Sequence, residues 1–234
     1  MPNPKLSIVI PVWNNYHFTN LTLLDLLHLP EDHHLIVVDN GSSDGTRNLL
    51  PANRLDVIRL VENLGFAGAC NIGFQKAQEL GSENILFLNN DIRVRSNLKL
   101  WTQPLIEAAQ RGVIAGPTVG CLDRNLNFRC EASKWPSTGY SYISGWCIAA
   151  SLETWQNLIV RDTSSGPFSE EFGLVYFEDT DLGFKAREQN IPMEIVDVPV
   201  SHYGKATSKK IGISRLYVPA KEKFIKKWKG RVSE

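Results

Sequence analysis

The residues best suited to chemistry in this chain lie in one acidic cluster and at the end of one apolar run. Phe177-Glu178-Asp179-Thr180-Asp181-Leu182 places three acids within four residues. Glu178 and Asp181 are three apart, so they share one face at a helix N-terminus, where acids also stabilise the helix dipole. A carboxylate held there can act as a general base. Asp91 ends an apolar run and can bind a hard divalent cation that bridges two phosphates.

A histidine is the third candidate for chemistry. His202 follows the apolar run IVDVPV, and a neutral imidazole there could complete a cation site begun by Asp91. Structural interpretations compete with these roles. Asp91 could cap the helix that follows it, although Ser96 is better placed to do so. His202 could be a structural side chain with its hydrogen bonds satisfied inside the protein.

The elements that position these residues follow from periodicity, which alternates between strand and helix in the first half. Short apolar, β-branched runs predict strands buried on both faces, over 6–13, 35–41, 56–63 and 84–91. Apolar residues at helical spacing predict helices over 18–29, 68–80 and 98–109. This alternation predicts an α/β fold with a mostly parallel sheet and helices on both faces.

The second half of the chain gives a more mixed pattern. Strands are expected over 113–120, 142–151 and 193–203, and helices over 152–158 and 178–189. Residues 121–142 carry turn residues and few periodic apolar side chains, and 174–177 form an aromatic, strand-like stretch. No linker or repeat divides the chain, so we expect one domain over 1–204 followed by a tail over 205–234.

Polar clusters follow each of the first four expected strands. They occupy 11–15, 39–46, 63–71 and 89–91. Ligands of an open parallel sheet bind beyond the carboxyl ends of its strands, so these clusters should meet at one edge. The GxGxxG fingerprint and the GxxxxGK[ST] loop are both absent, which argues against a standard NAD site and a P-loop NTPase.

Charge divides the chain into two opposed parts. Its 234 residues contain 25 Lys and Arg and 25 Asp and Glu, a balance that argues against a nucleic-acid-binding protein. Residues 203–234 nevertheless hold ten basic and two acidic residues, so this segment is +8 and the remainder is −8. The composition excludes a disordered, collagen-like or disulfide-scaffold chain. The sequence shows no signal peptide and no apolar run of about 20 residues, so we expect a cytoplasmic protein.

The basic tail predicts a helix over 218–230. Its apolar residues near one face are Ala220, Phe224, Ile225 and Trp228. One interpretation is packing on the body with the lysine stems along the apolar surface. A second is peripheral contact with an anionic membrane surface at the inner face of the membrane. A third is that 203–213 folds over a bound ligand as a lid.

Six strings, taken in order, resemble glycosyltransferase family 2 over about residues 5–205. They are SIVIPVWNN, VVDNGSSDGT, ENLGFAGACNIG, FLNND, YFEDTDLGFKA and SHY. The resemblance implies the GT-A fold, a nucleotide-binding half over 1–112 and an acceptor half over 113–204. It looks closest to the rhamnosyltransferase-like branch of bacterial surface polysaccharide synthesis. The resemblance also implies an inverting enzyme, and because the QxxRW motif and membrane helices of processive synthases are absent, it implies a non-processive one.

The resemblance also implies partners and roles for individual residues. The donor would be a UDP- or dTDP-sugar and the acceptor a hydroxyl of a glycan or lipid-linked molecule. Asp39 would accept a hydrogen bond from N3–H of uracil or thymine, since a carboxylate only accepts. Mg²⁺ or Mn²⁺ would bind Asp91 and His202, and Asp179 of the Glu178-Asp179 pair would be the catalytic base. Gly145 and Trp146 would shape the acceptor site. The nucleotide contacts would come from Pro11, Val12, Asn14, Asp39, Phe66, Asn71 and Asn90.

One departure from the family pattern keeps alternatives open. Asn89 stands where the first acid of the family's DxD motif stands, so the site carries one charge fewer. Metal affinity would then be lower, and the diphosphate would depend more on Lys205, Lys209 and Lys210. Asn89 is the only support for a non-catalytic nucleotide-sugar-binding module. A sugar-phosphate nucleotidyltransferase would need a Gly-rich, basic loop where PVWNN stands. The sequence indicates neither the sugar nor the oligomeric state.

Overall fold

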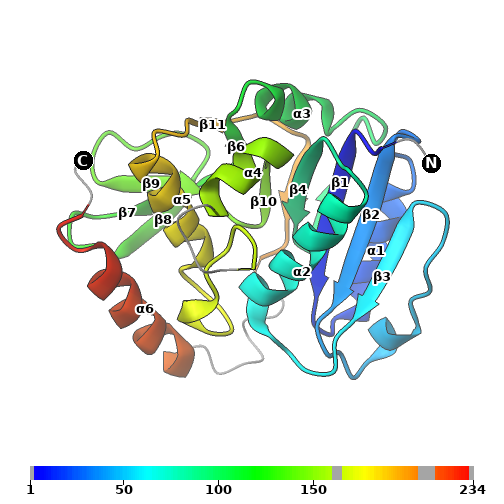
Figure 1. Cartoon of the computed structure of the whole chain (residues 1–234), viewed down its shortest axis with the longest axis horizontal. Coiled ribbons are helices and arrows are strands. Elements are labelled where there is room, and N and C mark those ends of the chain that lie inside the picture. The colour runs from blue at the N-terminus through cyan, green and yellow to red at the C-terminus, as the bar shows by residue number, and fades with distance from the viewer. Residues whose placement is uncertain (1–2, 160–164, 205–213, 232–234) are drawn as a thin grey trace.

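A seven-stranded sheet forms the centre of the computed structural model, which describes residues 3–159, 165–204 and 214–231 (Figure 1). The strand order is β11 (Met193–Ile195), β6 (Ile114–Gly116), β10 (Cys147–Ser151), β4 (Asn84–Leu88), β1 (Leu6–Val12), β2 (His33–Asp39) and β3 (Leu55–Arg59). Strand β1 pairs in parallel with β2 and β4, whereas β10 runs antiparallel between β4 and β6. The expected α/β fold with a mostly parallel sheet is confirmed.

Helices cover both faces of this sheet. Helices α1 (Tyr16–Leu26) and α3 (Gln103–Gln110) pack on one face, through a core that includes Leu26 and Leu105. Helices α2 (Gly65–Glu79), α4 (Leu152–Ile159) and α5 (Glu178–Glu188) pack on the other. The central strands β1 and β2 are therefore buried on both faces, which explains their continuous apolar sequence.

Two small sheets complete the architecture and were not fully predicted. Strands β7 (Val119–Leu122), β8 (Phe128–Ala132) and β9 (Tyr140–Ile143) form an antiparallel sheet. Strand β8 lies where no strand was expected, whereas β7 and β9 overlap the ends of the strands expected over 113–120 and 142–151. Strands β5 (Ile92–Val94) and β12 (Val200–His202) pair antiparallel, so the single strand expected over 193–203 is in fact β11 and β12. The expected strand-like stretch at 174–177 was wrong, because Tyr176 and Phe177 adopt positive φ angles of 74° and 70°.

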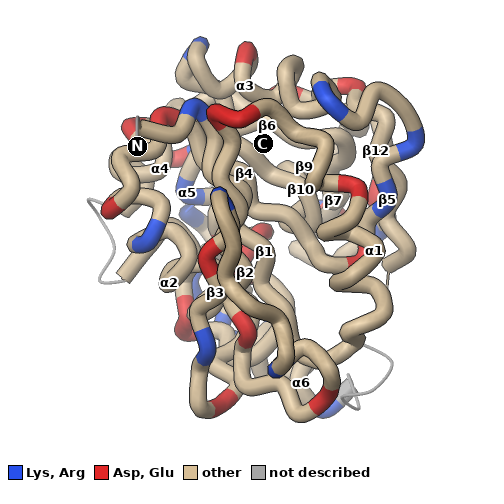
Figure 2. The backbone as a smooth tube through the Cα atoms, turned by 90° about the vertical axis from the view of Figure 1, so that its right-hand side faces the viewer, with Lys and Arg blue, Asp and Glu red and all other residues tan. Residues whose placement is uncertain are grey.

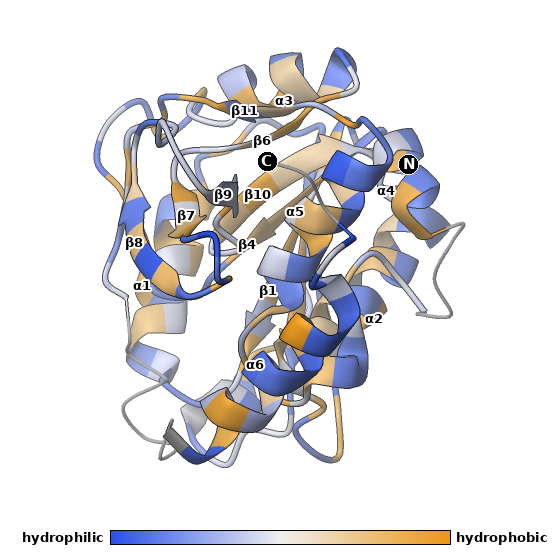
Figure 3. Ribbon diagram, turned by 90° about the vertical axis from the view of Figure 1, so that its left-hand side faces the viewer, coloured by the Kyte–Doolittle hydropathy of each residue, from blue (hydrophilic) through white to orange (hydrophobic). Residues whose placement is uncertain are grey.

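The C-terminal helix α6 (Ser214–Trp228) packs on the body, as the first interpretation of the tail held. Phe224 is fully buried and Trp228 is 2% exposed, in a cluster with Phe172, Phe177 and Phe184. Figure 3 shows α6 in front, with hydrophobic segments alternating with hydrophilic ones. Because its apolar face is covered by the body, this face is not available to insert into a membrane. Contact of the tail's lysines with an anionic membrane surface stays a prediction.

A buried ion cluster fastens α6 to α5. Asp181, on α5, is fully buried, and its Oδ1 accepts hydrogen bonds from Trp228 Nε1 at 2.7 Å and from Lys227 Nζ at 2.8 Å. Its Oδ2 accepts from Ser169 Oγ at 2.7 Å. Asp181 therefore has a structural role, whereas Glu178 and Asp179 line the cavity. The proposed lid over 203–213 lies almost entirely outside the described residues, as do Lys205, Lys209 and Lys210.

The charged residues of the body are interspersed. Figure 2 shows Lys and Arg alternating with Asp and Glu over the face in view, rather than gathered on one side. Among the described helices, none is long and apolar enough to cross a membrane.

Truncating the buried face of α6 is expected to destabilise the whole domain. Phe224→Ala should lower the free energy of unfolding by about 3–5 kcal/mol, since it removes a fully buried ring and leaves a cavity. Chemical denaturation would measure this, with Val218→Ala on the same helix as the control. Val218 is 54% exposed, so its variant should change stability by no more than about 0.5 kcal/mol. Equal effects of the two variants would contradict the observed docking of α6.

Candidate active site

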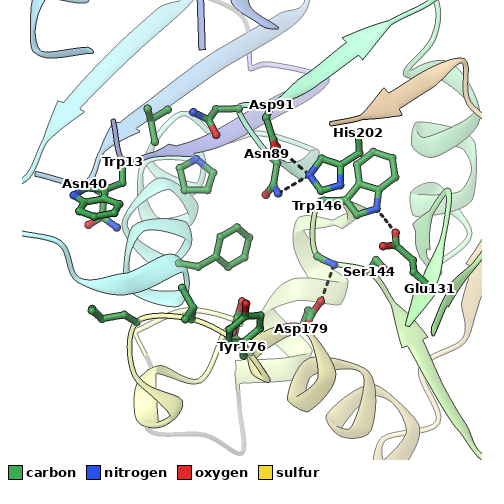
Figure 4. A pocket seen from close by; sticks show the side chains of 18 of the residues that line it. Trp13, Asn40, Asn89, Asp91, Glu131, Ser144, Trp146, Tyr176, Asp179 and His202 are labelled. Carbon is green, nitrogen blue, oxygen red and sulfur yellow. Dashed lines mark hydrogen bonds and ion pairs between the residues drawn. The ribbon is translucent and has the colours of Figure 1, made fainter. Parts of the chain in front are cut away.

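A cavity of about 630 Å³ opens at the carboxyl ends of β1 and β4, where the polar clusters were expected to meet. It brings together ten of the thirteen predicted site residues (Figure 4). These are Pro11, Val12, Phe66, Asn90, Asp91, Gly145, Trp146, Glu178, Asp179 and His202. Asn14, Asp39 and Asn71 do not reach its wall.

The end of the cavity beside β1 and β2 is built by Asn40 and Asn63, which lie in the polar clusters 39–46 and 63–71 but were not predicted individually as site residues. Asn40 Nδ2 donates to Asn63 Oδ1 and to the carbonyl of Gly65, both at 2.9 Å. Its Oδ1 accepts from the backbone N–H of Leu64 at 2.8 Å. These bonds fasten the loop after β3 against the end of β2. Trp13 and Phe66 line the same end and give it an aromatic character.

The three predicted residues outside the wall hold loops together. Asp39 is buried, and its Oδ1 accepts from the backbone N–H of Ser42 at 2.9 Å. Asn14 Oδ1 accepts from the N–H of Ser43 at 2.8 Å. Asn71 is fully buried, and its amide bonds to the backbone of Phe168 and to Glu170. A single sequence does not reveal such partners, because they lie up to 99 positions away.

Strand pairing between β5 and β12 places His202 beside Asp91. His202 pairs with Ile92, and the two side chains meet with Nε2 2.9 Å from Asp91 Oδ1. The Asn89 amide lies 3.2 Å from the same nitrogen. The imidazole also stacks on Trp146, with ring centroids 4.9 Å apart and 12° between the planes. The ring is therefore held in position from its face and from its edge.

This arrangement suits a divalent cation that keeps most of its ligands elsewhere. A cation could replace the proton between Asp91 Oδ1 and His202 Nε2. Mg²⁺ typically uses one or two protein carboxylates and takes its remaining ligands from water and substrate phosphates. No group of three or more His, Cys, Asp or Glu suited to a metal occurs within the part of the chain that the structure describes. The donor set therefore fits a cation shared with a bound diphosphate, rather than one enclosed by protein.

The first turn of α5 aims Asp179 into the cavity. The positive φ angles of Tyr176 and Phe177 turn the chain sharply before the helix begins at Glu178. Asp179 Oδ2 accepts from the N–H of Gly145 at 3.0 Å, and Oδ1 accepts from the N–H of Thr180 at 2.7 Å. A Cβ on Gly145 would lie only 2.9 Å from Asp179 Cβ. The glycine is therefore needed for this close approach.

The two adjacent carboxyl groups differ in proton affinity. Burial, followed by the charge of Asp179, raises the pKa of Glu178 to about 8. Burial also raises the pKa of Asp179, but the N–H groups of Gly145 and Thr180 oppose that shift. Two close carboxylates ionise in separate steps. A pKa of about 8 keeps Glu178 mostly protonated at pH 7, whereas the two N–H groups favour the ionised form of Asp179.

Sequence reasoning missed a third part of the wall, contributed by β8 and β9. Phe128, Glu131 and Tyr142 line the cavity near Asp179. The alternation of Phe128 and Cys130 with Arg129 and Glu131 was the only available signal, and it is short. Four carboxyl groups line the cavity, and its described lining contains no Lys or Arg. An anionic ligand would therefore need a cation from outside this wall.

The fold and this cavity define an α/β protein with a ligand site where parallel strands end. The family model of glycosyl transferase family 2 matches residues 7–146, which is more than half of the chain. The chain therefore belongs to glycosyl transferase family 2.

Two bacterial proteins are similar to the chain over different lengths. An uncharacterized protein of Mycobacterium tuberculosis is 25% identical over 221 residues, which cover 88% of this chain and 77% of that protein. The undecaprenyl-phosphate 4-deoxy-4-formamido-L-arabinose transferase of Photorhabdus laumondii is 28% identical over 145 residues, which cover 56% and 41%.

A solved structure supports the fold assignment. The crystal structure of GalNAc-T7 with UDP, GalNAc and Mn²⁺ matches 94% of this chain with a TM-score of 0.68 and 15% identity. The chain spans about half of that structure, since the match covers 47% of its length. The expected GT-A fold is thereby confirmed.

Proposed function

We propose that this protein transfers a sugar from a UDP- or dTDP-sugar to a hydroxyl group of a glycan or lipid-linked acceptor, with inversion. One observation carries the proposal: a carboxylate suited to general base chemistry, Asp179, opens into the same cavity as the Asp91–His202 pair. Family membership supports the nucleotide-sugar donor. The rhamnosyltransferase-like motifs favour a hexosyl or deoxyhexosyl group and a role in bacterial surface polysaccharide synthesis.

The catalytic roles in this proposal belong to two groups of residues that line the cavity, the Glu178-Asp179 pair and the Asp91–His202 pair. Asp179 removes the proton from the acceptor hydroxyl while the oxygen attacks the anomeric carbon on the face opposite the leaving group. The transition state is oxocarbenium-like, as in glycoside chemistry generally. Glu178, protonated near neutral pH, adds no second charge beside the base. Asp91 and His202 would hold Mg²⁺ or Mn²⁺, which supplies charge neutralisation for the leaving nucleotide diphosphate.

The proposal also gives each half of the chain a different substrate to bind. Residues 1–112 supply the nucleoside end, where Pro11, Val12, Trp13 and Phe66 offer apolar and aromatic surface to a base and ribose. Residues 113–204 supply the acceptor end, where Gly145 and Trp146 adjoin Asp179. The GalNAc-T7 structure contains UDP and Mn²⁺, and the Photorhabdus protein is named for undecaprenyl phosphate. These relatives support a uridine nucleotide, a manganese ion and a lipid-linked acceptor.

Nucleotide binding tests this proposal directly. Isothermal titration calorimetry with UDP, dTDP and GDP, each with and without Mn²⁺, should show binding of UDP or dTDP that Mn²⁺ strengthens by at least about tenfold. Binding without turnover of any nucleotide sugar would favour the non-catalytic module for which Asn89 argues. Failure of all three nucleotides to bind would contradict both functions.

A further inference from the structure

The acceptor end of the cavity contains an acidic residue to which neither the family pattern nor the proposed mechanism gives a role. Glu131 lies on β8, in the three-stranded sheet, and lines the wall shared with Glu178 and Asp179. Its side chain is exposed to solvent. It can therefore meet a ligand that enters from outside.

One oxygen of Glu131 is held in place and the other is not. Trp146 Nε1 donates to Glu131 Oε1 at 2.6 Å, and Thr118 Oγ1 donates to the same oxygen. Within residues 3–159, 165–204 and 214–231, no hydrogen bond or ion pair engages Oε2. Figure 4 shows the carboxylate directed to the Trp146 indole, on the side of the cavity that also holds Asp179. Glu131 Oε2 is therefore an oriented oxygen that can accept a hydrogen bond from a ligand.

The charge around this oxygen determines which ligand groups it can take. Glu131 and Asp179 are both carboxylates, and no Lys or Arg lines the described cavity. A carboxylate or phosphate on an acceptor would meet these charges without compensation, and like charges brought close together at an interface weaken binding. A hydroxyl group, in contrast, can donate to Oε2.

We propose that Glu131 determines acceptor specificity: its Oε2 binds a hydroxyl of a neutral sugar, and its charge excludes acidic sugars. The proposal rests on the transferase function proposed above, because it requires a sugar acceptor beside Asp179. Glu131 also positions Trp146, whose indole stacks on His202. Its charge must therefore be tested without removing that hydrogen bond.

Glu131→Gln separates these two roles, because the amide oxygen can still accept from Trp146 while the charge is lost. The probes are methyl β-D-glucopyranoside and methyl β-D-glucopyranosiduronate, which differ only in a hydroxymethyl group against a carboxylate. With UDP and Mn²⁺ present, ligand-observed NMR titrations should show the wild type binding the neutral glycoside at least about tenfold tighter. In Glu131→Gln the difference should fall to about twofold, mainly through tighter binding of the uronate.

Thr118→Val is the matched control. It removes the other hydrogen bond to Oε1 but leaves the charge of Glu131 unchanged, so the preference for the neutral glycoside should persist. Equal binding of the two probes to the wild type, no binding of the neutral probe, or an unchanged preference in Glu131→Gln would overturn the proposal. Calorimetry with UDP on the same samples separates the two possible failures. Retained UDP binding would place the error in this inference, whereas its absence from the wild type would place it in the proposed function.

Discussion

Asp179→Asn is expected to lower turnover by about 10²-fold or more, because an amide cannot accept the proton of the attacking hydroxyl. The fold and nucleotide binding should survive. Asp179 accepts from the N–H groups of Gly145 and Thr180, and the new amide oxygen can keep one of these two bonds. The lost bond should cost about 1 kcal/mol of stability. Turnover of the nucleotide sugar, measured beside nucleotide affinity, checks the prediction.

Glu178→Gln is the matched control, since it changes the neighbouring acid by the same chemistry. With a pKa of about 8, Glu178 is already uncharged near neutral pH, so its amide variant should retain turnover within about threefold at pH 7. Equal losses in the two variants would show that the pair acts as one unit. Unchanged turnover of Asp179→Asn would remove Asp179 from the role of base.

Glu178 should also make the stability of the protein depend on pH. The pKa of Glu178 rises from 4.5 to about 8 on folding, so between these values the folded protein holds a proton that the unfolded chain does not. Its contribution to stability is present below pH 4.5 and is lost as the pH rises through about 8. The melting temperature of the wild type should therefore fall relative to that of Glu178→Gln as the pH rises from 4.5 to about 8. Parallel curves for the two proteins would contradict the raised pKa.

The fold was predictable where burial dictated the sequence. Strands β1, β2 and β4 are covered on both faces, so their continuous apolar runs could be recognised without a structure. Strand β8 is largely exposed, and its five residues carry no such signal. Strands β5 and β12 are three residues each and stabilise one another by pairing. Their existence depends on a contact between distant segments, which a local pattern does not contain.

The candidate site also has residues that the sequence could predict and residues that it could not. Asp91 and the Glu178-Asp179 pair were predicted because each lies at the end of a predicted strand or the start of a predicted helix. The local sequence pattern is enough to locate such positions. Glu131 was missed because only the folding of β7, β8 and β9 into one sheet brings it to the cavity. Asn71 was expected to contact the nucleotide, yet its amide is directed to residues 168–170. The type of a polar residue does not reveal which partner its side chain reaches.

Asp91→Asn is expected to abolish most of the strengthening of nucleotide binding by Mn²⁺, a loss of at least about tenfold in affinity. Asp91 is the only carboxylate that the structure places against His202 within the described residues, so its removal leaves a single charged or basic ligand there. Binding measured without metal should change little, since the aromatic nucleoside end is untouched. Calorimetry in Mn²⁺ and in EDTA gives both values. A variant that keeps the full effect of Mn²⁺ would exclude Asp91 as a ligand.

Asn89→Asp provides the opposite change at the neighbouring position. The Asn89 amide lies 3.2 Å from His202 Nε2, so a carboxylate there would face the same cation site and add one negative charge. Affinity for hard cations follows the number of charged oxygen ligands, so Mn²⁺ should bind about tenfold more tightly than in the wild type. The extra charge also opposes the diphosphate when no metal is present, so nucleotide affinity in EDTA should fall. An increase with Mn²⁺ together with a decrease in EDTA would place cation and diphosphate at this one site, whereas a uniform change in both conditions would contradict that placement.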